Sequence, residues 1–292
     1  MHDIIVRSVS DSDDLKQIEA IQRLTWGMDD VEIIPGRFLH AVQYNGNCLL
    51  GAYDDGRLVG FVLGILATVE APPERPDRVA ASRLQLYSAI MGVLPEFQSS
   101  GVGYRLKLAQ REFALRLGVR LVTWTFDPLE SRNGFFNVAK LGVVCHRYLR
   151  DFHGPMSGIN AGLPSDRFNV EWWVTSNRVK TRLSRERRPL KLGAFLAAGA
   201  TLINPAGLNR QGLPTPAAEP NLSDDRILLL EIPPRFQELK AADMALAQAW
   251  RLHCRDLFER YFGRNYLLTD FVRHEDEDGR ARSYYVLAFG DS

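Results

Sequence analysis

A short turn that reads QSSGVG, residues 98–103, separates two segments of contrasting hydrophobic pattern. The preceding residues 86–93 are largely apolar, as in a strand that is covered on both faces. The following residues 103–117 repeat apolar side chains at the spacing of an amphipathic helix. Because a strand that leads into such a helix requires helices layered on a sheet, this segment favours an α/β fold.

The same turn has the properties of an anion-binding loop. Gly101 and Gly103 let the backbone approach a ligand closely, and the first helical turn offers unpaired N–H groups at the positive end of the helix dipole. A pyrophosphate fits this description. The dinucleotide-binding fingerprint would need its third glycine at Leu106, and no Gly-Lys-Ser/Thr follows for a P-loop. The alternative is a glycine-rich turn that binds no ligand.

Composition and charge indicate an ordinary globular protein. The 292 residues are 46% hydrophobic and 24% charged, which suits one large domain or two modest ones. The formal net charge is +1, so no global field draws the protein to nucleic acid or to anionic lipid. We therefore expect neither a nucleic-acid partner nor a membrane partner.

The cysteines and the N-terminal sequence bear on the cellular compartment. Cys48, Cys145 and Cys254 lack the spacing of a structural zinc site, so we expect reduced, mostly buried thiols and no metal. The first residues carry no basic region followed by an apolar stretch. The longest nearly apolar run, 192–203, is shorter than the roughly 20 residues of a membrane helix. These features predict a cytoplasmic protein.

Hydrophobic periodicity predicts an alternation of strands and helices over the first 175 residues. Asp11 to Asp14 offers N-cap oxygens to the first helix, and Asp55-Gly56 supplies a tight hairpin turn. Three prolines between residues 71 and 82 predict a solvated loop. The predicted strands are 4–9, 48–53, 58–69, 84–93, 121–126, 143–149 and 167–175, and the predicted helices are 15–24, 35–45, 103–117 and 132–141.

The composition changes after Ser176. Residues 178–191 are strongly basic and residues 204–225 are rich in Pro, Asn and Gly, so we predict a linker-like region over 177–225. A β-α-β-β extension over 226–292 follows, with strands at 227–232, 266–273 and 283–289 and a long helix that ends at Gly263. We expect this extension to pack on the rest of the chain or on a second subunit, and a homodimer is a prediction.

With this order of elements, the Gln-x-x-Gly-x-Gly turn resembles the coenzyme A pyrophosphate loop of the GNAT superfamily of N-acyltransferases. The resemblance covers 4–175. It implies a mixed, mostly antiparallel central sheet flanked by helices, and an acyl-CoA-binding catalytic domain over 1–176. It also implies that Val93 pairs with the pantetheine arm. The residues that would form the pyrophosphate loop are Gln98, Ser99, Gly101, Val102, Gly103 and Tyr104.

A second match lies at 133–143. Asn133 and Asn137, followed by Lys-Leu-Gly-Val, resemble the GNAT helix whose asparagine helps to position the coenzyme arm. Many GNAT enzymes place a tyrosine four residues before that glycine to protonate the leaving thiolate, and this chain has Val138 there. Tyr148 and His146 come shortly afterwards as substitutes. An aromatic residue on a half-buried strand explains Tyr148 equally well.

Acyl transfer to an amine needs a neutral nitrogen, a polarised carbonyl group and a protonated leaving sulfur. In GNAT-like sheets two strands splay apart, so a backbone N–H near Gly92 or Val93 would polarise the carbonyl. Asp127 is a candidate base, although Asp-Pro before a helix is also a turn signal. His146 is the other candidate base, since imidazole titrates near neutral pH.

A carboxylate on the acceptor or on the acyl chain would call for a bidentate arginine. Arg167 is the candidate, and a plain ion pair with Asp166 or Glu171 is the alternative. Trp26 and Trp172 are candidate walls of the acceptor pocket, with burial in the core as the alternative. Segments such as 22–27 and 162–168 resemble a bacterial GNAT subgroup of predicted acetyltransferases associated with N-acylamino acid racemases.

The resemblance implies an acyl-CoA-dependent N-acyltransferase that transfers an acetyl or succinyl group to the primary amine of a small molecule, which we take as amino-acid-like. Acetyl-CoA or another acyl-CoA, with succinyl-CoA among the options, would be the co-substrate, and attack would be direct within a ternary complex. The alternative is a non-catalytic acyl-CoA sensor or interaction module. The basic run at 178–191 is expected to be a solvated face, with a phosphate contact as the alternative.

Overall fold

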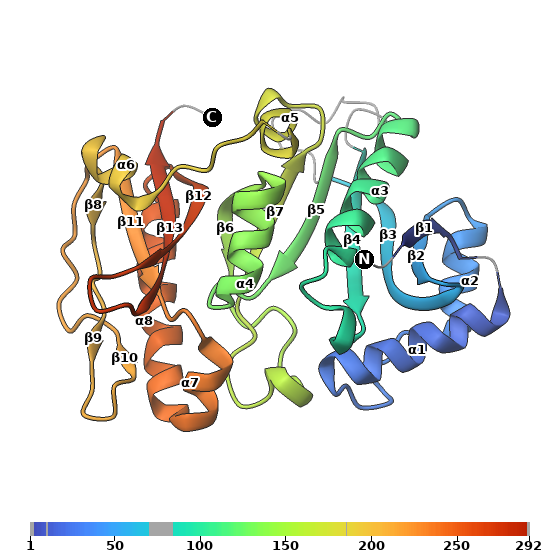
Figure 1. The fold of residues 1–292 in the computed structure, drawn as a ribbon, viewed down its shortest axis with the longest axis horizontal. Coiled ribbons are helices and arrows are strands. Elements are labelled where there is room, and N and C mark those ends of the chain that lie inside the picture. Colours follow the sequence, from blue (N-terminus) through green and yellow to red (C-terminus); the bar gives the residue numbers. More distant parts are fainter. Residues whose placement is uncertain (1–2, 10, 70–83, 185, 291–292) are drawn as a thin grey trace. The chain divides into compact units, whose positions relative to one another are not determined.

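A computed structural model describes residues 3–9, 11–69, 84–184 and 186–290 (Figure 1). It divides into two compact units, residues 1–124 with 157–160 and residues 125–156 with 161–292. The loop predicted at 71–82 lies outside the described residues. The predicted fold class is confirmed, because both units combine mostly antiparallel strands with flanking helices.

The first unit has the strand order β1-β2-β3-β4-β5. Neighbouring strands are antiparallel except β4 and β5, which are parallel. The strands are β1 (Ile4–Ser8), β2 (Cys48–Asp54), β3 (Arg57–Thr68), β4 (Leu84–Val93) and β5 (Leu121–Phe126), of which the last two residues belong to the second unit. The helices are α1 (Ser12–Trp26), α2 (Gly36–Tyr44) and α3 (Val102–Arg116), with single 3-10 turns at Pro95–Phe97 and Gly158–Asn160.

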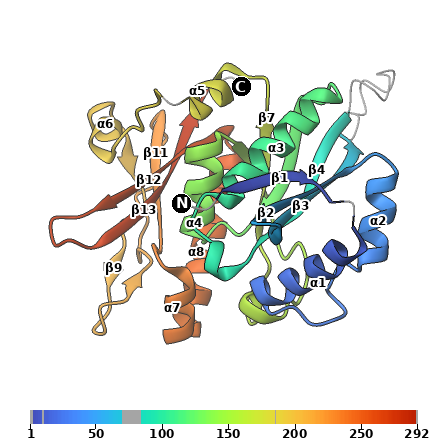
Figure 2. The same ribbon diagram turned by 45° about the vertical axis from the view of Figure 1, so that its right-hand side comes forward.

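Local signals set the ends of these elements as predicted. The side chain of Asp11 accepts a hydrogen bond from Asp13 N–H and caps α1, which ends at Gly27 with φ 64°. Asp55 and Gly56, both at positive φ, form the hairpin turn between β2 and β3. Figure 2 shows α1 and α2, in blue, beside the strands of this unit.

Helices α1 and α3 cover opposite faces of β4. A Cβ atom at Gly92 would lie 3.0 Å from Trp26 and 3.2 Å from Ile21 of α1. Gly103 of α3 instead faces Met91 at 3.5 Å and Val93 at 4.0 Å. Because successive strand residues point to opposite faces, β4 lies between the two helices.

The second unit has the strand order β7-β6-β12-β13-β11-β8, antiparallel except for the short β11–β8 pair. β12 pairs with β6 through Leu268 and Cys145. The strands are β6 (Val144–Leu149), β7 (Arg167–Trp173), β8 (Thr201–Leu202), β11 (Ile227–Ile232), β12 (Tyr266–Glu275) and β13 (Ala281–Phe289), with a separate hairpin of β9 (Gly207–Leu208) and β10 (Pro214–Thr215).

The helices of this unit differ from the predictions in two places. The helix predicted at 132–141 is one α turn, α4 (Ser131–Gly134), that continues as a π-helix over Phe135–Leu141. The long C-terminal helix is two helices, α7 (Phe236–Ala242) and α8 (Met244–Phe262). They separate at Asp243, because its side chain leaves the helix path to accept a hydrogen bond from Leu246 N–H.

The region predicted to be linker-like is largely folded. It contains α5 (Asn177–Leu183), α6 (Leu192–Ala197) and strands β8 to β10. Two arginines of the basic run are built into the unit rather than solvated. Arg178 donates to the backbone oxygens of Gly142 and Thr269, and Arg182 pairs bidentately with Asp270. Composition indicated a solvated segment here because these partners are distant in the sequence.

The core of the second unit is aromatic. Phe168 of β7 and Phe258 of α8 meet edge to face with ring centroids 4.6 Å apart, and both rings pack on Tyr285. All three cysteines are free and buried, as predicted. Among the described helices, none is long and apolar enough to cross a membrane.

Candidate functional site

The predicted pyrophosphate loop has the geometry of an anion site in the first unit. β4 ends at Val93, a 3-10 turn follows, and α3 starts after Gly101, whose φ is 94°. The first intrahelical hydrogen bond runs from Arg105 N–H to Gly101 O at 3.1 Å. The N–H groups of Val102, Gly103 and Tyr104 therefore precede the hydrogen-bonded ladder and lie at the positive end of α3.

Backbone conformation in the loop supports this assignment. Ser99 has a φ of 65°, which is costly for a residue with a side chain. Gly101 adopts a left-handed conformation and has no neighbour within 4 Å of a Cβ position, so the space beside it is open. Ser99 lies two residues before Gly101, and backbone strain of this kind is common at ligand-binding sites.

Gln98 holds the loop in place through its side chain. Its Nε2 donates to the backbone oxygen of Val93 at 3.1 Å, and Thr25 Oγ1 donates to the same oxygen at 3.3 Å. The side chain of Gln98 thus fastens the start of the loop to the end of β4. In this arrangement the side chain supports the loop, and the backbone N–H groups are the donors for an anion.

The ladder between β3 and β4 shows which N–H group of β4 is directed away from β3. Leu94 N–H donates to Val59 O at 2.9 Å, so the preceding residue, Val93, directs its N–H to the other side. In the same register Gly60 is opposite Val93 and Phe61 is opposite Gly92, so the N–H of Gly92 faces β3. Of the two residues predicted to supply the carbonyl donor, Val93 therefore directs its N–H away from β3 and Gly92 does not.

The parallel ladder between β4 and β5 is short. Its described pairs are Leu86 with Val122 and Tyr87 with Thr123. A bulge follows in β4, because Leu63 pairs with Ile90 and Gly64 pairs with Ser88, which leaves one extra residue on β4. From Ser88 to Val93, β4 thus continues beyond its described pairing with β5. This is the strand edge along which the coenzyme arm was predicted to lie.

The helical segment 131–141, which contains Asn133 and Asn137, provides one buried and one exposed side-chain amide in the second unit. Asn137 is buried in the π-helix, and its backbone oxygen accepts a hydrogen bond from Val143 N–H. Asn133 is exposed on α4. Val138, at the position where many GNAT enzymes have a tyrosine, is fully buried. The helix therefore directs an apolar side chain into the core at that position.

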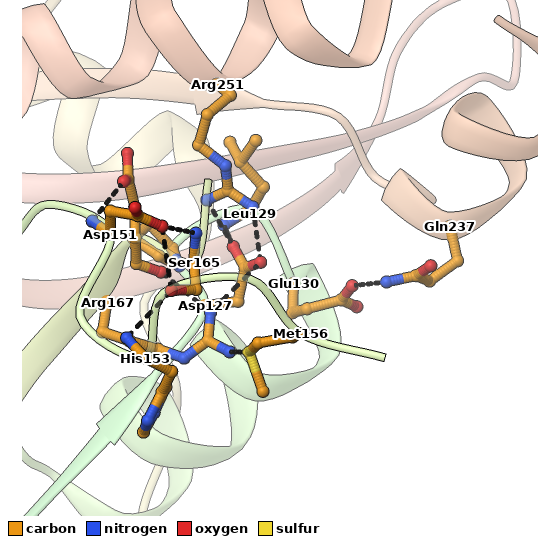
Figure 3. A network of polar contacts seen from close by, with 12 residues as sticks. Asp127, Leu129, Glu130, Asp151, His153, Met156, Ser165, Arg167, Gln237 and Arg251 are labelled. Carbon is orange, nitrogen blue, oxygen red and sulfur yellow. Dashed lines mark hydrogen bonds and ion pairs between the residues drawn. The ribbon is translucent and has the colours of Figure 1, made fainter. Parts of the chain in front are cut away.

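Asp127 is held by two arginines in the second unit. Arg251 of α8 donates to both carboxylate oxygens, at 2.7 and 2.5 Å, and Arg167 lies 3.7 Å from one of them (Figure 3). Leu129 N–H adds a third hydrogen bond. Burial alone would raise the pKa of Asp127, but these partners hold it below its ordinary value. This carboxylate suits an anchor for two guanidinium groups better than the predicted base.

Arg167 is a buried cation whose ion pair, with Asp127, is long at 3.7 Å. Its guanidinium donates to the backbone oxygen of Asp166 at 2.9 Å and faces the sulfur of Met156 at 3.1 Å. A thioether is a weak acceptor, and the carboxylate of Asp127 is already bound bidentately by Arg251. The predicted alternative, an ion pair with the side chain of Asp166 or Glu171, is wrong, because the ion pair is with Asp127.

Tyr148 belongs to a second buried network. Its hydroxyl donates to Asp166 at 2.7 Å, and Arg255 of α8 binds both oxygens of the same carboxylate at 2.8 Å. The ring stacks on Phe258. Burial and the adjacent Asp166 carboxylate raise the pKa of Tyr148 well above its ordinary value. This tyrosine holds its proton tightly, which favours the packing alternative over an acid role.

The remaining predicted residues, His146, Trp172 and Trp26, make other contacts. His146 is half-exposed on β6, with Nδ1 4.0 Å from Glu171. Trp172 is fully buried and donates its indole N–H to Leu141 O at 2.9 Å, so its prediction as a pocket wall is wrong. Trp26 is partly buried at the end of α1, where its ring packs on Gly92 of β4.

Three charged residues, one in the first unit and two in the second, were not predicted as site residues. Arg251 anchors Asp127, Lys107 is buried on α3, and Glu130 is largely buried beside Asp127. Burial and the Asp127 charge raise the pKa of Glu130, although Gln237 donates to it. No sequence motif marks any of them, because each acquires its surroundings from distant segments.

Among the described residues, no three His, Cys, Asp or Glu side chains lie close enough to hold a metal ion. No protein-family model matches the sequence, and no curated protein matches it.

Several solved structures are similar in fold. Arabidopsis thaliana NAA60 in complex with a bisubstrate analogue has 19% identity and a TM-score of 0.46, over 58% of this chain and 97% of that one. Arabidopsis thaliana Naa50 in complex with a CoA-Ac-MVNAL bisubstrate analogue has 15% identity and a TM-score of 0.44, over 57% and 97%. The ribosomal-protein-S18-alanine N-acetyltransferase of Escherichia coli has 11% identity and a TM-score of 0.43, over 63% and 99%. At these identities the similarity concerns the fold alone.

Proposed function

We propose that the chain is an acyl-CoA-dependent N-acyltransferase that acylates the primary amine of a small, amino-acid-like molecule. The observation that supports this most is the loop from Ser99 to Tyr104. It combines a strained residue, an open glycine and three N–H groups that have no intrahelical acceptor at the start of α3. The pyrophosphate of coenzyme A is an anion of the size and charge that such a loop binds.

The strand edge beside this loop supports the same reaction. An acyl-CoA whose phosphates lie on α3 would extend its arm along β4, where Val93 directs its N–H away from β3. The N–H of Val93, beside the phosphate end, would hydrogen-bond the arm, and a backbone N–H of β4 farther toward Ser88 would hydrogen-bond the thioester carbonyl and stabilise the oxyanion that forms when an amine attacks. The acyl group, acetyl or succinyl, is part of the proposal.

We expect Gly103→Glu to abolish coenzyme binding. The substitution puts a carboxylate beside the N–H groups that would hold the pyrophosphate, so like charges repel at the phosphate site. In a thermal-shift measurement with coenzyme A, the parent gains about 2.7 kcal/mol of stability at a ligand concentration about 100 times its dissociation constant. The variant should gain none.

Gly103→Ala is the matched control. A Cβ at this position would contact Met91 at 3.5 Å, an ordinary van der Waals distance, so the alanine variant should fold and retain coenzyme A binding. If Gly103→Glu melts like the parent and still binds coenzyme A with the parent affinity, the proposed site is wrong.

The acceptor side of the proposal rests on Arg167. A buried guanidinium whose nearest acceptors are a peptide oxygen and a thioether has donors to offer to a substrate carboxylate. We expect Arg167→Lys to reduce kcat/KM for an amino acid by about 10- to 100-fold. The planar fork is lost while the positive charge beside Asp127 stays.

The control for Arg167→Lys is a second acceptor that lacks the carboxylate, not a second variant. The decarboxylated amine of the same amino acid should be a poor substrate for the parent and should be affected little by Arg167→Lys. Equal losses for both acceptors would mean that Arg167 has only a structural role.

The non-catalytic alternative has one observation in its favour, the buried Val138 in place of a hydroxyl donor. Release of thiol from acetyl-CoA or succinyl-CoA with a panel of amines separates the two functions. Binding of coenzyme A without thiol release from any amine would favour an acyl-CoA sensor.

A further inference from the structure

Lys107 is a buried lysine of α3 with only 2% of its surface exposed. Its Nζ donates to Ser88 Oγ of β4 at 2.7 Å and to Gln110 Oε1 at 3.1 Å. The same nitrogen lies 3.7 Å from the centroid of the Trp124 ring on β5. All four residues belong to the first unit.

The partners of Lys107 are neutral. The ion pairs found between described residues include none with Lys107. Buried charges are normally paired, because desolvation of an ammonium group is costly. Here burial lowers the pKa of Lys107 to about 7, and Cys48 of β2 is the titratable neighbour that acts against this shift. Among the described residues, no carboxylate forms an ion pair with this buried amine.

The position of Lys107 relates it to the proposed coenzyme site. Ser88 and Trp124 are the first residues beyond the Leu86–Val122 and Tyr87–Thr123 pairs, so Nζ lies where the described pairing of β4 and β5 ends. Gly103 and Lys107 are one helical turn apart on the same face of α3. Gly103 faces Met91 and Val93, and Lys107 faces Ser88, so the two helix residues follow one strand edge from its end toward its middle.

We propose that Lys107 supplies the positive charge and the proton that the leaving thiolate of coenzyme A requires. This inference rests on the proposed function. The coenzyme arm would start at the phosphates on Val102 to Tyr104, follow β4 inward and end in its sulfur. The stretch of β4 from Ser88 to Val93 is about 16 Å long, which gives the arm a strand edge to follow. Lys107 lies at the inner end of this stretch, and Val138 offers no hydroxyl for the same task.

In the proposed step the acyl group moves from sulfur to nitrogen. The neutral amine attacks the thioester carbon, a C–N bond forms, and the C–S bond breaks with its electron pair on sulfur. The ammonium of Lys107 donates a proton to the sulfur, which leaves as a thiol, and Lys107 becomes neutral. The proton released from the acylated nitrogen passes to water, and Lys107 takes one back from water. An amine that is close in pKa to a thiol, which is ordinarily near 8.5, suits this exchange.

The test uses the thiol of bound coenzyme A and needs no acceptor. The ultraviolet absorbance of the thiolate is followed during a pH titration of the complex, with the desulfo-coenzyme A complex subtracted to remove the protein's own cysteines and tyrosines. An opposite charge nearby lowers a pKa by about 1–3 units, so in the parent the thiolate should form at lower pH than in free coenzyme A. In Lys107→Met and Lys107→Gln it should form about one unit or more higher than in the parent.

Two further measurements make the test specific. Lys16→Met, a change of an exposed lysine on α1, should leave the thiol titration unchanged. With an accepted amine, Lys107→Met should lower kcat by about 10- to 100-fold and leave the affinity for coenzyme A unchanged, because the lost interaction forms only as sulfur becomes charged.

The outcomes separate this inference from the proposed function. If the parent and both Lys107 variants bind coenzyme A and titrate its thiol alike, Lys107 has no role at the sulfur and the coenzyme site stands. If the parent does not bind coenzyme A, the proposed function fails and this inference fails with it.

Discussion

Arg251→Met should lower the free energy of unfolding by about 3–5 kcal/mol, the usual cost of removing one partner from a buried ion pair. Arg251 is 2% exposed and donates to both oxygens of Asp127, which is itself nearly buried. Without it, the carboxylate keeps Leu129 N–H and the more distant Arg167. Urea unfolding at pH 7 followed by circular dichroism measures the loss.

A double-mutant cycle shows whether the loss of stability comes from the unpaired carboxylate of Asp127. Asp127→Asn combined with Arg251→Met leaves no unpaired carboxylate, so it should be more stable than Arg251→Met alone. Arg280→Met is the control, since Arg280 forms an exposed pair with Asp278 and its removal should cost less than about 1 kcal/mol. A loss in Arg251→Met no larger than in Arg280→Met would contradict the prediction.

The pH dependence of stability has a definite sign here. The arginines hold the folded pKa of Asp127 below its unfolded value of about 3.9. The stability that this depressed pKa contributes is present above about pH 4 and is lost as pH falls through the folded pKa. The Asp127→Asn/Arg251→Met variant lacks the carboxylate, so it should lose less stability than the parent on acidification below pH 4.

The elements that the sequence predicts well are those with local causes. The Asp55-Gly56 turn needs two residues at positive φ, and both residue types favour it. The α3 start needs Gly101 in the left-handed region, and the QSSGVG segment carries that requirement within six letters. Strand and helix periodicities likewise depend on near neighbours, so these elements lie within a few residues of their predicted ends.

The elements that it predicts poorly depend on distant partners. Trp172 becomes a core residue because its indole finds Leu141 O, and nothing within 30 residues of Trp172 signals that bond. Arg178 occurs in a basic run, but two backbone oxygens from other segments remove it from solvent. The π-helix after α4 has no local sign comparable to a glycine or a proline. Composition characterises a segment as a whole, whereas tertiary contacts determine the burial and the partners of each side chain.

The candidate site also has parts with local causes and parts that depend on distant partners. Its anion loop is local, so the sequence predicts it by residue number. Asp127 is also visible as an Asp-Pro turn, but its partner Arg251 lies 124 positions away in α8. An anchor and a base look alike in sequence, because both are single aspartates at a strand end. Only the bidentate contact with Arg251 distinguishes them.

Lys107→Met should make the protein more stable at neutral pH. The folded pKa of Lys107 is about 7, below the unfolded value of about 10.4, so the folded state binds fewer protons between these two values. The cost of burying this amine is complete at and below pH 7, and it disappears as pH rises toward 10. At 1.36 kcal/mol per pKa unit the cost is on the order of 5 kcal/mol.

The interactions that Lys107 makes reduce the expected gain. Its hydrogen bonds to Ser88 and Gln110 and its contact with the Trp124 ring offset about 2 kcal/mol, so the net gain of Lys107→Met at pH 7 should be about 3 kcal/mol. At pH 10 most of the cost is gone and the lost interactions remain, so the variant should be no more stable than the parent. Urea unfolding at pH 7, 8.5 and 10 gives the three differences.

The sign reversal between pH 7 and pH 10 is the decisive feature of this prediction. A methionine that simply packs better would stabilise the protein equally at all three pH values, whereas a buried amine gives a difference that decreases as pH rises. Lys16→Met, which removes an exposed lysine, should show no such trend. A parent and a Lys107→Met variant that keep a constant difference from pH 7 to pH 10 would show that Lys107 has the same charge in the folded and unfolded states, and its place beside Trp124 would then have to be explained by packing alone.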